Sequence, residues 1–133
     1  MSTTCALTTT IAELQDLLTL PDGWNSYDAL APDPDAVAHA VAWITEVYTH
    51  IMTTKQQWIE PSVTACANGE AVLSWCYGQK TLDVRINKQH IHYLQGWSRG
   101  ANAKLTDGCI NSIDDIHELW QWLLTSMSTG AIV

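Results

Sequence analysis

Residues 71–93 read AVLSWCYGQKTLDVRINKQHIHY, and this stretch decides the fold. Apolar and polar residues alternate along three short runs, which is typical of strands with one buried and one exposed face. Glycine leads the Gly-Gln pair at 78–79, which suits a two-residue turn, and the Asn-Lys pair at 87–88 is a weaker turn signal. Two-residue loops at both places predict four cross-strand pairs on a single buried face: Trp75–Leu82, Leu73–Val84, Val84–Ile91 and Leu82–Tyr93.

The same register gathers polar side chains on the opposite, open face of the sheet. It places Ser74 opposite Asp83, Asp83 opposite His92, and Arg85 opposite His90. A Ser-His-Asp hydrolase is not indicated, because its nucleophile needs the imidazole as a neighbour and here the carboxylate stands between them. His90 and His92 share a face, so with Asp83 they form a candidate metal site. A polar sheet face without a metal is the interpretation we favour.

A further hairpin precedes this stretch. The Asn-Gly pair at 68–69 is a strong hairpin signal, but two registers stay open. With a two-residue turn, the side chains that face the core would be those of Ser62, Thr64 and Cys66. A slip by one residue would bury Val63 and Ala65 instead.

Three helices are predicted from apolar periodicity and capping signals. Residues 11–20 carry an apolar stripe, and Thr10 opens a capping box before it. Asp33 caps a second helix that runs to about Met52, with proline in its first position. A last helix begins after Ser112 and has a broad apolar face.

The predicted element order is α-α-β-β-β-β-α. This order favours an α+β fold, in which a four-stranded antiparallel meander carries the helices on one face. Residues 97–109, WSRGANAKLTDGC, are expected to form a loop or a ragged edge strand. Residues 1–133 have the usual length of one domain, so a single domain is expected.

Composition limits the classes of ligand. The chain has 14 acidic and 6 basic residues, a formal net charge of −8, and no cluster of Lys and Arg that would suit a nucleic acid. It contains no phosphate loop, dinucleotide fingerprint or nucleophile elbow, so no cofactor is expected. Because we find neither a secretion signal nor a membrane-length apolar run, we expect a cytoplasmic protein without membrane contact. Free thiols are then expected at all four cysteines: Cys5, Cys66, Cys76 and Cys109.

Seven tryptophans without any phenylalanine are an unusual balance. Trp and Tyr are favoured where one end of the ring stays wet, as at protein interfaces. Trp120 joins the apolar face of the last helix, whereas Trp122 lies about 200° around the helix from it. We therefore predict a partner-binding surface containing Trp122. Trp24 and Tyr27 are further candidate contacts, with a role as core cover as their alternative.

The segments GWNSYDALAPDPDAVAHAV and PSVTACANGEAVLSWCYGQKTLDVRI resemble an uncharacterised family of small bacterial proteins. That family has a G-W-[DN]-x-Y-x-A loop, a proline-started helix, and an L-x-W strand before a glycine turn. The resemblance covers half to two thirds of the chain and implies the fold but no activity. Asp28 departs from the pattern, because glycine is expected at that position.

These observations favour a non-catalytic protein-interaction module: an accessory, inhibitor or immunity-type protein. Its partner would be another protein, for which the acidic charge favours a basic one, or else a second copy of the chain. A small metal-binding enzyme built on His90, His92 and Asp83 is the rival hypothesis. A small-ligand binder with a pocket between helices and sheet is a third.

Overall fold

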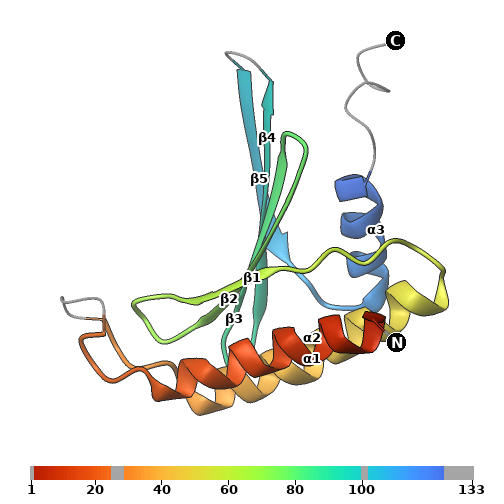
Figure 1. The fold of residues 1–133 in the computed structure, drawn as a ribbon. Helices are drawn as coiled ribbons and strands as arrows, with labels where there is room; N and C mark the ends of the chain where they lie inside the picture. Colours follow the sequence, from red (N-terminus) through yellow and green to blue (C-terminus); the bar gives the residue numbers. More distant parts are fainter. Residues whose placement is uncertain (1, 25–28, 100–101, 125–133) are drawn as a thin grey trace, which may run out of the picture.

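The computed structural model describes residues 2–24, 29–99 and 102–124. Three α-helices, one short 3₁₀ helix and five strands follow each other along the chain (Figure 1): α1 (Ser2–Asp16), η1 (Leu17–Thr19), α2 (Pro34–Thr53), β1 (Ser62–Ala65), β2 (Ala71–Tyr77), β3 (Lys80–Ile86), β4 (Ile91–Arg99), β5 (Asn102–Cys109) and α3 (Ile113–Leu124). The α+β class is confirmed. The predicted number of four strands was wrong, because the sheet has five.

The strands form an antiparallel meander in the order β1-β2-β3-β4-β5. The fifth strand occupies the segment expected to be a loop or a ragged edge, and it pairs with β4 from His92↔Cys109 to Arg99↔Asn102. Together β4 and β5 form a long hairpin that projects away from α1 and α2 (Figure 1). The two outer strands of the sheet are therefore the short β1 and the longer β5.

The β2–β3 hairpin has the predicted register. Trp75 pairs with Leu82 and Leu73 with Val84. Gly78 has a φ of +64°, which a left-handed first turn position requires and which glycine adopts without a steric penalty.

The β3–β4 register differs by two residues from the predicted one. Ile91 pairs with Ile86, and Tyr93 pairs with Val84. The loop has four residues because the Asn87 carboxamide oxygen accepts hydrogen bonds from the backbone N–H groups of Gln89 (2.8 Å) and His90 (2.6 Å). An asparagine side chain that satisfies two loop amides stabilises this wider turn. Since the shift is by two, every residue keeps its predicted face.

The first hairpin adopts the second of the two open registers. Val63 pairs with Leu73 and Ala65 with Ala71, so the apolar residues of β1 face the core. The Cys66 N–H donates to the Glu70 carbonyl at 2.9 Å and closes a loop wider than the predicted two-residue turn. The preference follows from burial, because the other register would bury hydroxyl groups and expose the apolar residues.

The helices agree with the sequence in two cases of three. The Asp33 side chain accepts a hydrogen bond from the Asp35 N–H, which caps α2 as predicted, and α3 begins directly after Ser112. Helix α1 begins at Ser2, so the predicted cap at Thr10 was wrong; Thr10 lies inside the helix and is fully buried. Packing of α1 against α2 outweighs the low helix propensity of the threonine-rich start. In the described parts of the chain, no helix has the length and apolar composition to cross a membrane.

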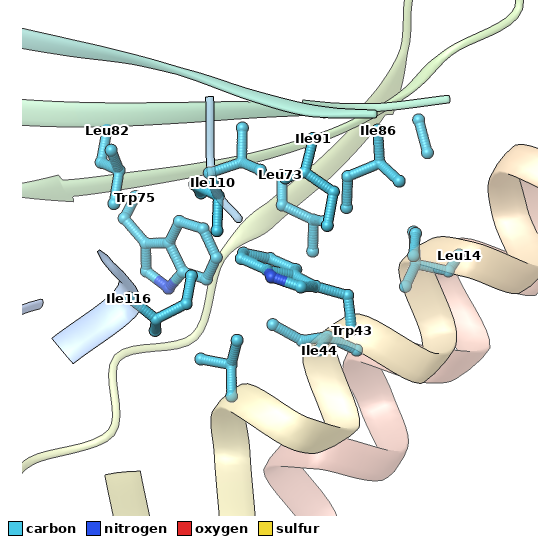
Figure 2. Packing of buried hydrophobic residues seen from close by; sticks show 14 of the residues in the cluster. Leu14, Trp43, Ile44, Leu73, Trp75, Leu82, Ile86, Ile91, Ile110 and Ile116 are labelled. Atoms are coloured by element: carbon cyan, nitrogen blue, oxygen red, sulfur yellow. The ribbon is translucent and has the colours of Figure 1, made fainter. Parts of the chain in front are cut away.

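The hydrophobic core lies between α2 and the sheet. Figure 2 shows Trp43 and Ile44 of α2 facing Leu73, Ile86 and Ile91 of three neighbouring strands. All five side chains are buried. This packing fixes the buried face of the sheet and leaves the alternate strand residues on the open face.

A chain of tryptophan rings joins the helices to the sheet. Trp75 makes edge-to-face contacts with Trp43 (centroids 6.3 Å apart) and Trp120 (5.6 Å), and Trp120 stacks on Trp58 at 5.6 Å. The indole N–H of Trp75 donates to the Ile59 carbonyl at 2.7 Å. Trp75 and Trp120 are thus large core rings whose indole N–H groups have backbone partners, whereas the buried indole N–H groups of Trp58 and Trp97 have no partner in the described structure.

Replacement of Gly108 by alanine should destabilise the β4–β5 pair. A Cβ atom there would lie 2.8 Å from the Tyr93 hydroxyl and 2.9 Å from two ring carbons of that side chain. The ring must move, which we expect to cost about 1–3 kcal/mol in the free energy of unfolding measured with urea. In a Tyr93→Ala background the same replacement should cost almost nothing. An equal cost in both backgrounds would show that the ring does not set the requirement for glycine.

Candidate functional site

Of the three residues of the candidate metal site, His90 and His92 lie close together, with ring centroids 5.9 Å apart, whereas Asp83 is opposite neither of them. Asp83 pairs with Leu94, not with His92, and His90 belongs to the β3–β4 loop. His92 stands opposite Arg85, so the predicted pairs Asp83–His92 and Arg85–His90 were wrong. The cause is the wider loop. Among the described residues, no three His, Cys, Asp or Glu side chains lie together in a way that could hold a metal ion.

The corrected register creates two rows across the open face of the sheet. One row runs from Arg85 on β3 through His92 on β4 to Cys109 on β5. The next row contains Asp83 and Asp107, with Leu94 between them. The row with the guanidinium, imidazole and thiol groups is thus adjacent to the row with the two carboxylates.

These rows line a concavity of about 430 Å³, which we call the open-face concavity. Its charged side chains are Glu70, Asp83, Asp107 and Arg85, so carboxylates outnumber guanidinium groups by three to one. The concavity lies on the surface of the sheet and is not enclosed, and the side chains of Arg85 and Asp107 are exposed. A site of this shape suits a flexible or extended ligand that carries positive charge.

Cys109 and His92 are in direct contact in this concavity. The Cys109 Sγ lies 3.5 Å from His92 Nδ1, and both side chains are exposed. Cys66 and Cys76 are free thiols as well, whereas the Cys5 side chain lies outside the described residues. Among the three cysteines whose side chains the structure describes, Cys109 is thus the one with an imidazole neighbour.

The predicted partner-binding aromatics differ in their surroundings. Trp122 is half-buried, and the Lys80 ammonium lies 5.1 Å from its ring centroid and donates to its carbonyl at 2.6 Å. Trp24 is half-buried too, and its indole N–H donates to the Leu30 carbonyl at 2.8 Å. Tyr27 lies outside the described residues. Both tryptophans pack against the core, and partner contact stays a prediction for them.

The outer edge of β5 is free of any strand in the described structure. The Ile110 N–H donates to the Ile91 carbonyl at 2.8 Å, so the backbone groups of residue 110 point toward β4. Direction alternates along a strand, which turns the N–H and C=O groups of residues 103, 105, 107 and 109 outward. Leu105 sits in the middle of this edge with 70% of its side chain exposed. Such an edge is a template for another strand.

Two further concavities flank the helix side of the same hairpin. One, of about 290 Å³, contains Asp115 and Glu118 of α3 beside Tyr93 of β4. The other, of about 170 Å³, contains Trp122 of α3 beside Lys104 of β5. Trp122 therefore belongs to the surroundings of β5, which the sequence did not indicate.

Comparisons of this chain with protein-family models, with curated proteins and with solved structures find no match. The resemblance to the bacterial family with the G-W-[DN]-x-Y-x-A loop stays a prediction. The open-face concavity and the edge of β5 are therefore the features from which a function can be inferred.

Proposed function

We propose that this protein is a non-catalytic protein-binding module that takes up an extended segment of its partner as a sixth strand beside β5. The observation that carries the proposal is the free edge of β5, which projects with β4 from the rest of the domain (Figure 1). Added strands bind through main-chain hydrogen bonds, and sites for their alternate side chains provide specificity. The exposed Leu105 would be covered by such a strand.

The concavities beside β5 supply sites for those side chains. A strand paired with β5 directs its residues alternately to the two faces of the sheet. On one face they reach the open-face concavity, which contains Asp107. On the other face they reach the concavities that contain Glu118 and Trp122. Trp122 thus keeps its place as a candidate partner-binding residue, now as the wall of a site rather than as an exposed anchor.

The charges around β5 favour a basic partner segment. Asp83 and Asp107 lie on the open face, and Asp115 and Glu118 lie on the helix side. Among the β5 side chains that line these concavities, Lys104 is the basic one. The net charge of −8 adds long-range attraction for a basic partner. A second copy carries the same negative charge, so electrostatics opposes self-association along this edge.

The test uses two octapeptides of alternating residues, one of lysine and valine and one of glutamate and valine. We expect the lysine peptide to bind, with a dissociation constant that rises steeply with salt, and the glutamate peptide to bind at least roughly tenfold more weakly. Leu105→Pro should abolish binding, because proline removes an outward N–H at an edge position where it is otherwise tolerated. Calorimetry gives the affinities, and sedimentation at the same concentrations reports on dimers.

Leu105→Thr is the matched control, because it removes the exposed apolar side chain and keeps the N–H donor. It should retain most of the affinity that Leu105→Pro loses, while both variants melt close to the parent temperature. Equal binding of the two peptides, unchanged binding by Leu105→Pro, or dimers in the absence of peptide would overturn the proposal of a basic partner strand at β5.

A further inference from the structure

The contact between Cys109 and His92 points to chemistry that strand addition does not use. The two residues are cross-strand neighbours on β5 and β4, and Sγ lies 3.5 Å from Nδ1. Both are exposed on the open-face concavity, so a small molecule can approach the sulfur. The register holds the pair in place, because neighbouring strands fix the separation of directly opposite side chains.

A thiol beside an imidazole can act as a nucleophile. The thiolate is the reactive form of cysteine, and a hydrogen-bonded base that removes the thiol proton generates it where it is needed. The His92 Nδ1 atom meets this requirement when its ring proton is on the other nitrogen. The same pairing of sulfur and imidazole is the minimal arrangement of a cysteine nucleophile and its general base.

The other two described cysteines provide a contrast within the same molecule. Cys76 is exposed on β2 and stands opposite Thr81, and in the described structure it has no imidazole partner. Cys66 is half-buried, and burial raises the pKa of its thiol above the ordinary value, with Arg85 opposing and Glu70 adding to this effect. Exposure without a base at Cys76 and burial without a base at Cys66 both predict slower reactions than at Cys109.

The charges of the open-face concavity select among possible reactants. The concavity that contains the pair is lined by three carboxylates, those of Glu70, Asp83 and Asp107, and by one guanidinium, that of Arg85, which stands opposite His92. An approaching cation is therefore attracted and an approaching anion repelled. The preferred reactant is a small disulfide that carries ammonium groups.

We propose that Cys109, with His92 as its base, is a site of thiol–disulfide exchange with small cationic disulfides. The Cys109 thiol gives its proton to Nδ1 of His92, and the thiolate attacks one sulfur of the disulfide. A bond forms between Cys109 Sγ and that sulfur while the original S–S bond breaks. The departing thiolate takes the proton back from His92. The Cys109 sulfur is oxidised to the mixed disulfide, and the departing sulfur is reduced to a thiol.

The test follows each cysteine of the full chain by peptide mass spectrometry at neutral pH. The probes are cystamine, which is cationic, bis(2-hydroxyethyl) disulfide, which is neutral, and 3,3′-dithiodipropionate, which is anionic. We expect Cys109 to react with the neutral probe at least about tenfold faster than Cys76. This ratio is smaller than the rate increase that a positioned general base usually provides. The rate at Cys109 should fall in the order cationic, neutral, anionic.

Two variants separate the base from the charges. His92→Gln should bring Cys109 to the rate of Cys76 with the neutral probe and leave Cys76 unchanged, and a melting temperature close to that of the parent shows that the variant is folded. Asp83→Asn with Asp107→Asn should reduce the ratio of the cystamine rate to the neutral-probe rate at Cys109. Equal rates at Cys109 and Cys76, or a Cys109 rate that does not respond to His92→Gln, would overturn the proposal. None of these measurements uses the lysine–valine or glutamate–valine octapeptide. A negative result therefore does not affect the proposal of strand addition at β5.

Discussion

We expect Val84→Asp to unfold the protein. Val84 is fully buried at the centre of β3, where it pairs with Leu73 on one side and Tyr93 on the other. An aspartate there must either bury an unpaired charge or expose the core around it. We expect a loss of roughly 5 kcal/mol or more in the free energy of unfolding, which equals the whole stability of many domains of this size. Circular dichroism should show no cooperative unfolding transition.

Thr81→Asp on the same strand is the matched control. Thr81 is exposed on the open face, three residues from Val84, and its replacement adds the same charge to the same strand. It should change the free energy of unfolding by less than about 1 kcal/mol. Two variants that behaved alike would show that the faces of β3 are not assigned correctly.

Trp120→Ala should be the most destabilising of the tryptophan replacements on α3. Trp120 is 2% exposed, contacts Trp58 and Trp75 through its ring, and donates its indole N–H to the Gln57 carbonyl at 3.0 Å. Truncation removes the ring that joins α3 to the sheet, so we expect a loss of about 3–5 kcal/mol. Chemical denaturation followed by circular dichroism measures it.

Trp122→Ala provides the comparison two residues further along the same helix. Trp122 is half-buried, and its contact with the Lys80 ammonium is made by the ring face. We expect a loss of about 1–2 kcal/mol, because less surface leaves the water and a modest cation–π contact is removed. A Trp122 variant as unstable as the Trp120 variant would mean that Trp122 belongs to the core and not to the surroundings of β5.

The sequence predicted the buried face of the sheet more reliably than its loops. Alternation along residues 71–93 assigned Leu73, Trp75, Leu82 and Val84 correctly, because one buried face forces a period of two. The β3–β4 loop was misjudged because Asn87 can support a two-residue turn or a wider one, and only its side-chain hydrogen bonds distinguish them.

The fifth strand, whose segment was expected to form a loop or a ragged edge strand, was left out of the predicted sheet for a different reason. Residues 97–109 contain Gly100 and Gly108 and carry few β-branched residues, so intrinsic propensity opposes a strand. Pairing with β4 supplies the stabilisation, and Tyr93 fills the space over Gly108. A sequence reading of each segment by itself does not include that contribution.

The candidate site depended on these two errors. His92 was recognised as an open-face residue, but a loop two residues too short placed Asp83 opposite it instead of Arg85. With β5 absent from the predicted sheet, Cys109 had no neighbour on β4, so the thiol–imidazole contact was out of reach. Cys109 and His92 are 17 positions apart in the sequence, and this spacing alone does not indicate a contact.

Amide hydrogen exchange along β5 tests strand addition most directly. The N–H groups of residues 103, 105 and 107 point to the free edge, whereas those of 104, 106 and 108 already face β4. On addition of the lysine–valine octapeptide, residue-resolved NMR should show slower exchange at the odd-numbered amides and little change at the even-numbered ones. Uniform protection along the hairpin, or protection confined to α3 around Trp122, would contradict the addition of a strand to β5.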